Sequence, residues 1–146
     1  MTRYARIAFA GLAWLFVAGI VIQVFLIGLG LFGDVAYRQT HIEFGYSIGI
    51  LVLLLLIAAL VARPGLRTVG LVIGLFVLYI VQTLLPSARQ AYPAIAALHP
   101  VNALLIFGLT LYVARSAMAL ARLGGESGAP VAPQPAPQPA PRDAAS

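Results

Sequence analysis

The sequence predicts an all-α protein, a four-helix transmembrane bundle, and three observations lead to that prediction. Of the 146 residues, 62% are hydrophobic and only 9% are charged, whereas a soluble domain carries about 25% charged residues. The mean hydropathy of +0.99 reflects the same imbalance. Four apolar stretches reach the roughly 20 residues needed to cross a bilayer core about 30 Å thick. The connections between them are short, so we expect an up-down-up-down bundle.

The four expected spans follow one another within a membrane domain of residues 1–123. They cover residues 7–32, 44–62, 68–85 and 97–117. The first apolar run is far longer than the 7–15 residues of a signal peptide, so we expect it to be retained as a span. The connections between spans are rich in Gly, Pro or charged residues, which is typical of turns.

The arginines predict the orientation, and the absence of cysteine excludes several classes of site. The chain has no cysteine, which excludes disulfides, thiol catalysis and cysteine-ligated metals. Its net charge of +5 comes from arginine at the ends of the spans, which is a topology signal and does not indicate a nucleic-acid partner. One side of the predicted topology carries Arg3, Arg6, Arg63, Arg67, Arg115 and Arg122. The positive-inside rule then puts both termini in the cytoplasm of a multi-pass protein of the bacterial plasma (inner) membrane.

A tail of residues 124–146 follows the last span. It repeats Pro-Gln-Pro-Ala and has no large apolar residue apart from Val131, so we expect disorder with polyproline II character. Two roles remain open for it: a solubilising tail, or a docking strip for a proline-binding module.

The polar residues of the spans form a faint internal repeat. An aliphatic pair precedes both Gln23 and Gln82, and a histidine follows each of them, His41 after 18 residues and His99 after 17. Such a duplication has a pseudo-twofold axis along the membrane normal. So few positions match that chance is the alternative explanation.

His41 and His99 are the only histidines, and each begins a helix on the predicted outer side. Either each one hydrogen-bonds water and headgroups at the interface, or the two share a ligand. Diagonal helices of a bundle lie about 11–14 Å apart, which is too wide for two imidazoles alone to share zinc but suits two axial ligands of one haem iron. The two histidines are level only if the fourth helix continues past Arg115.

Neighbouring residues have two readings each. Gly45 and Ala103 lie one turn after the histidines, where small residues suit either a flat ring or close helix packing. Gln23 and Gln82 suit either haem propionates and imidazoles or hydrogen bonds between helices. The outer loops carry Arg38 and Arg89, which are either partners for propionates or ordinary loop charge. The residues that could orient the histidines or accept protons are Glu43, Tyr46 and Asn102.

The segment Leu98-His99-Pro100-Val101-Asn102-Ala103, with Gln82 before it, resembles the third and fourth helices of one half of bacterial haem A synthase. Gln23 and His41 resemble the first two helices of that half. The resemblance implies that His41 and His99 ligate a b-type haem. Here Glu43 follows the histidine and cysteine is absent, so the oxygenating chemistry is not implied. The pattern also resembles an uncharacterised actinobacterial family of four-helix membrane proteins.

The expected function is therefore that of a small haem b protein with bis-histidine ligation near the outer leaflet. It would transfer electrons or hold haem rather than catalyse a reaction. Its expected partners are the lipid bilayer and a redox partner in the membrane or outside the cytoplasm. The alternative is a cofactor-free membrane scaffold or assembly subunit that acts through protein partners. A transporter ranks third, because no ionisable residue lies in the inner two-thirds of any span.

Overall fold

A computed structural model describes the backbone of residues 2–126 and the side chains of residues 3–122. Within that range every regular element is helical. The elements are α1 (Thr2–Phe32), α2 (Tyr37–Ser47), α3 (Gly49–Ala62), α4 (Leu66–Leu84), the 3₁₀ helix η1 (Leu85–Arg89), α5 (Pro93–Ala96) and α6 (Leu98–Glu126). The last helix enters the predicted tail by three residues, and the remainder of that tail, residues 127–146, lies outside the described residues.

Four helical segments of the described chain are long and apolar enough to cross a membrane. They are Arg3–Phe32, Tyr37–Ala62, Leu66–Arg89 and Pro93–Arg122. This confirms the all-helical, four-span prediction. The last segment continues past Arg115, as the level placement of the two histidines requires.

The second segment begins seven residues before the span that hydropathy predicts. The carboxylate of Asp34 accepts a hydrogen bond from the backbone N–H of Ala36 at 2.8 Å, which shapes the turn immediately before α2. The first two turns of α2 are polar, so a criterion based on apolar run length omits them. α2 and α3 then meet at Ile48, where the backbone leaves ideal helical geometry with φ −71° and ψ −9°.

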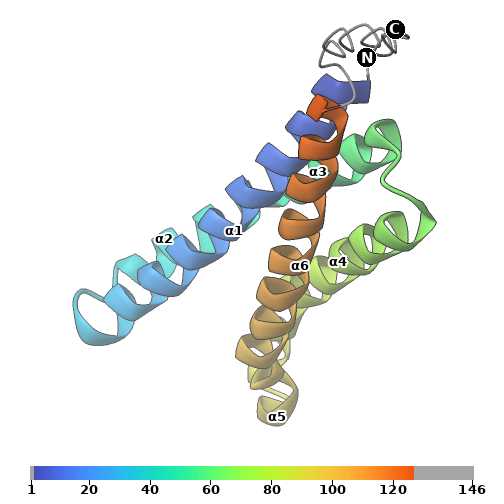
Figure 1. Cartoon of the computed structure of the whole chain (residues 1–146). Coiled ribbons are helices and arrows are strands. Elements are labelled where there is room, and N and C mark those ends of the chain that lie inside the picture. The colour runs from blue at the N-terminus through green and yellow to red at the C-terminus, as the bar shows by residue number, and fades with distance from the viewer. Residues whose placement is uncertain (1, 127–146) are drawn as a thin grey trace, which may run out of the picture.

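The long helices pack around one core. α1 packs against α6 and along α2 and α3, while α4 packs against α3 and α6. Figure 1 shows the first turns of α1 beside the last turns of α6 at one end of the molecule. Towards the other end, α1 and α2 diverge from α4, α5 and α6. In the half that carries the histidines, side chains such as Tyr79 therefore make the contact between the pairs α1–α2 and α4–α6.

Glycines of the spans differ in what surrounds them. A Cβ atom on Gly49 would lie 2.6 Å from the hydroxyl of Tyr79 and 3.0 Å from two of its ring carbons. Tyr79 itself is held, because its hydroxyl donates a hydrogen bond to the carbonyl of Gly45 at 2.5 Å. A Cβ on Gly70 meets nothing within 4 Å. Gly49 is thus needed for the close contact of α3 with α4, and Gly70 is not.

We expect Gly49→Ala to destabilise the bundle and Gly70→Ala not to. Alanine favours helix over glycine by about 1 kcal/mol, so Gly70→Ala should hold or raise the stability. Overpacking typically costs about 1–3 kcal/mol, so Gly49→Ala should lower it. Thermal unfolding of both variants in detergent tests this. Equal unfolding midpoints would contradict the packing described for Tyr79.

Candidate functional site

The two histidines come together between the helix pairs. His41 lies in the second turn of α2 and His99 in the first turn of α6, and both side chains are half-buried. Their ring centroids are 6.3 Å apart, and the ring planes are inclined by 71°. The extensive contacts of α2 are with α1 and α3. The two imidazoles therefore approach one another across the divide between α1–α2 and α4–α6.

Each histidine is anchored by the backbone of the preceding span. Nδ1 of His41 lies 3.0 Å from the carbonyl oxygen of Gln23. Nδ1 of His99 lies 3.0 Å from the carbonyl oxygen of Gln82. A carbonyl oxygen only accepts, so Nδ1 carries the proton in both neutral rings and Nε2 keeps its lone pair. The predicted Gln–His repeat is thus a repeat of the same contact in three dimensions.

Local sequence explains why the carbonyl of Gln82 is available. In an α-helix that oxygen would accept from the N–H four residues later, but that residue is Pro86, which has no N–H. The N–H of Leu85 is already bonded to Val81. His99 therefore supplies the hydrogen bond that Pro86 cannot. Gln23 lies inside α1, so its carbonyl accepts His41 through a second lone pair.

The side chain of Gln82 completes a network around His99. Its amide nitrogen lies 3.2 Å from Nε2 of His99. Its amide oxygen accepts from Nδ2 of Asn102 at 2.8 Å, and the same Nδ2 donates to the carbonyl of Leu78 at 2.9 Å. Asn102 is buried. It therefore orients the Gln82 amide so that the amide N–H points at the lone pair of His99.

The corresponding position in the first half lacks this support. Three residues after His41, where Asn102 would be expected by the repeat, the chain has Phe44, which donates no hydrogen bond. The side-chain oxygen of Gln23 is buried without a hydrogen-bond partner. Both halves thus have the bond from Nδ1 to a carbonyl. Only in the second half does the glutamine amide also bond to the histidine and to an asparagine.

Side chains cover Gly45, which was predicted to lie under a flat ring, and also Gly49 one turn later. The amide of Gln23 packs so closely on Gly45 that a Cβ there would collide with its nitrogen. Tyr79 covers Gly49 and meets Phe16 edge-on, with ring centroids 6.2 Å apart. These glycines therefore allow close packing between helices.

Sequence reasoning missed Tyr79. The signal for it was present, because a tyrosine in an apolar helix one turn before Gln82 needs a partner for its hydroxyl. That partner is the carbonyl of Gly45. Tyr79 thereby ties the α4 side of the bundle to α2, one turn below His41.

The remaining predicted residues lie around the pair. Arg38 packs its side chain on Gly30 and donates from Nε to that carbonyl at 3.1 Å, so it caps the end of α1 while staying exposed. Arg89 is exposed at the end of η1, and Ala103 is half-buried one turn after His99. Glu43 accepts from Gln39 at 2.9 Å, and it has no described contact with the histidine rings.

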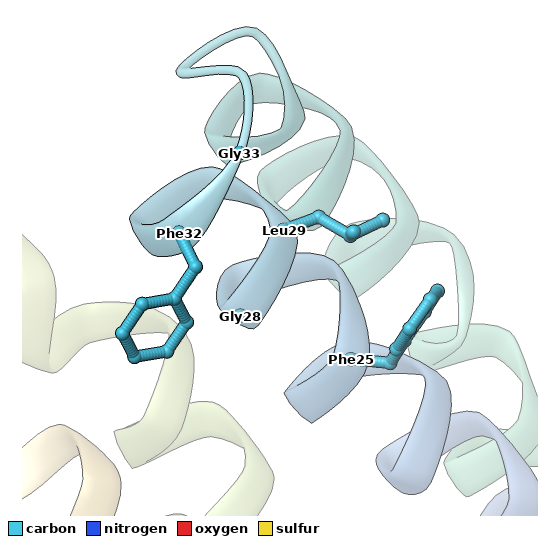
Figure 2. A pocket seen from close by; sticks show the side chains of 5 residues that line it. All are labelled: Phe25, Gly28, Leu29, Phe32 and Gly33. Atoms are coloured by element: carbon cyan, nitrogen blue, oxygen red, sulfur yellow. The ribbon is translucent and has the colours of Figure 1, made fainter.

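Neither of two hollows on the described part of the chain is lined by a histidine. The first, of about 360 Å³, lies at the end of α1 (Figure 2) and is lined by Phe25, Gly28, Leu29, Phe32 and Gly33. The second, of about 190 Å³, adjoins the His99 network through Asn102 and is also lined by Val81, Leu85, Leu98, Val101 and Leu105.

Comparison with known proteins gives one match. The model of a family described as "Family of unknown function (DUF6220)" matches residues 23–88, which is less than half of the chain. That segment includes Gln23, His41 and Gln82 and ends before His99. No curated protein and no solved structure matches the chain. Residues 23–88 are thus similar to a family of unknown function, and the similarity assigns them no activity.

We expect both neutral imidazoles to carry their proton on Nδ1, because each Nδ1 faces a carbonyl oxygen. Nitrogen-15 spectra of the histidine side chains, recorded at high pH on cofactor-free protein, report the tautomer. Gln82→Leu removes the amide that faces His99, so it should shift the Nε2 resonance of His99 and leave that of His41 in place. A predominant Nε2–H tautomer in either ring would contradict the hydrogen bonds described above.

Proposed function

We propose that this protein is a small b-type cytochrome of the membrane, with His41 and His99 as the two axial ligands of one haem. The approach of the two rings is the observation that carries the proposal. Imidazole–metal bonds of about 2 Å on both sides of a metal put the ring centres roughly 6 Å apart, and the centroids here are 6.3 Å apart. The ring spacing supports an axial pair, and a flat ring beside it would have to displace the side chains that cover Gly45 and Gly49.

The hydrogen bonds of the rings support the same role. Metal-bound histidines usually donate their other N–H to a carbonyl or carboxylate, which fixes the tautomer and the ring orientation. Both Nδ1 atoms face a backbone carbonyl, so both Nε2 atoms present a lone pair. The Gln82 amide now bonded to Nε2 of His99 has to turn aside when that nitrogen ligates a metal.

Other residues have supporting roles in this proposal. The unpartnered oxygen of Gln23 is an acceptor beside the first histidine. Arg38 in the first turn of α2 and Arg89 at the end of η1 are exposed, and their guanidinium groups suit carboxylates such as propionates. Haem, when bound, supplies one-electron redox chemistry. The proposed partner is a redox protein in the membrane or outside the cytoplasm, and the resemblance to one half of haem A synthase points the same way.

We also propose an up-down-up-down topology with both termini in the cytoplasm, in the plasma (inner) membrane. Its support is the arginine distribution, since the positive-inside rule assigns the arginine-rich end of the bundle to the cytoplasm. The histidine pair then lies near the outer leaflet.

A second candidate function is favoured by a different observation. Gln82, Asn102 and His99 satisfy one another without any ligand. A closed polar network of this kind can serve solely to lock α4 against α6. On that basis the protein is a cofactor-free scaffold or assembly subunit that acts through protein partners.

Removal of either histidine should abolish the six-coordinate, low-spin haem spectrum, because each ring supplies one axial bond. The test is the visible spectrum of His41→Ala and His99→Ala purified from haem-replete cells. Gln23→Ala should only shift the reduction potential or weaken haem retention. Gln39→Ala is the matched control, since its exposed side chain lies on α2 and bonds Glu43.

Two results would refute the haem proposal. One is wild-type protein that is colourless after purification from haem-replete cells, which supports the scaffold candidate. The other is an unchanged low-spin spectrum in either histidine variant.

Reporter fusions test the topology. A fusion within residues 86–93 should report an extracytoplasmic position, and a fusion after residue 146 should report the cytoplasm. A cytoplasmic signal from the 86–93 fusion would reverse the orientation and move the histidine pair to the inner leaflet.

A further inference from the structure

Six arginines gather at the end of the bundle opposite the histidines. Arg3 and Arg6 lie in the first turns of α1, and Arg115 and Arg122 lie in the last turns of α6. Figure 1 shows these two helix ends side by side. Arg63 and Arg67 flank the turn between α3 and α4. We call this set the arginine end.

The buried core shows that these three parts of the chain converge. Phe9 follows Arg6 by one turn, Ala62 directly precedes Arg63, and Ala114 directly precedes Arg115. All three of these apolar residues are fully buried, each at 0% exposure, in a single cluster. The backbones at Arg6, Arg63 and Arg115 therefore meet at one rim of the same core.

The charge of the arginine end is balanced only in part by the described chain, because one acidic residue, Glu126 at the end of α6, lies there. The acidic residues within 3–122 are Asp34 and Glu43, and both lie at the histidine end. Asp34 accepts from the backbone of Ala36, and Glu43 accepts from Gln39. Nearby like charges repel one another, and an external anion relieves this repulsion.

Arg6 shows where such an anion would bind. Its side chain is half-buried, and its Nε is buried without a hydrogen-bond partner among the described residues. A guanidinium donor removed from water and left unpaired is unfavourable. An acceptor from outside the described chain would satisfy it. Guanidinium groups match phosphate oxygens in charge and in planar, two-point geometry.

We propose that the arginine end binds the phosphate of an acidic phospholipid, with Arg6 at its centre. In the proposed topology the spans end here, so the arginine side chains can reach the lipid headgroups. Basic sites between transmembrane helices are known to take acidic headgroups. This site is remote from the histidine pair and does not depend on haem.

The test is native mass spectrometry of the full chain after purification from nanodiscs of phosphatidylglycerol and phosphatidylcholine in equal amounts. Wild-type protein should retain phosphatidylglycerol in preference to phosphatidylcholine. Arg6→Gln should lower that retention roughly tenfold, because it removes a charge-assisted contact. Arg89→Gln is the matched control, since it removes the same charge from the exposed η1 at the histidine end and should retain the lipid as wild type does.

A further variant and a competition with inorganic phosphate distinguish the possible outcomes. Arg6→Lys preserves the charge but loses the two-point geometry, so it should retain an intermediate amount; it also replaces Arg6→Gln if that variant does not fold. Equal retention by the Arg6 variants and Arg89→Gln would overturn the proposal, as would no preference between the two lipids. Displacement of phosphatidylglycerol by millimolar inorganic phosphate would identify a free-phosphate site and also overturn it.

Discussion

The bond from an imidazole Nδ1–H to a backbone carbonyl of the preceding span occurs twice in this protein, and the site depends on it. It sets the register of α2 on α1 and of α6 on α4, because His41 reaches Gln23 and His99 reaches Gln82. It also fixes the tautomer of each neutral ring, since a ring that donates from Nδ1 keeps a lone pair on Nε2. In the second half Pro86 makes the bond necessary by leaving the Gln82 carbonyl without its helical donor.

Packing elsewhere in the bundle keeps this polar contact in place. The core is formed from small and aliphatic residues of α1, α3, α4 and α6 together with Phe9 and Phe16 of α1, and it lies mostly on the side of the arginine end. Glycines at 45 and 49 let the side chains of Gln23 and Tyr79 approach the α2–α3 segment. Association of helices in lipid relies on such close contacts and on hydrogen bonds between helices, because lipid chains are as apolar as the side chains. The histidine end is held mainly by hydrogen bonds.

Much of this arrangement was predictable from the sequence. Apolar run length found the four segments, and the matched spacing of Gln23–His41 and Gln82–His99 predicted a repeat, which the structure shows as a repeated bond from Nδ1 to a carbonyl. The helix break at Ile48 was not predictable, since an apolar run shows no backbone dihedral angles. The start of α2 was predicted too late because its first turns are polar. The packing of Gln23 on Gly45 and the bond from Arg38 to the carbonyl of Gly30 were not predictable either. Each depends on a side-chain conformer that tertiary contacts select.

The most direct test of the central claim, that His41 and His99 are both axial ligands, is the electron paramagnetic resonance spectrum of the oxidised wild-type protein. Two imidazoles on one iron give a low-spin signal whose anisotropy depends on the angle between their planes. Two histidine ligands would make the ferric iron six-coordinate, so we predict a low-spin signal. A high-spin signal, or no haem signal at all in protein from haem-replete cells, would contradict the account.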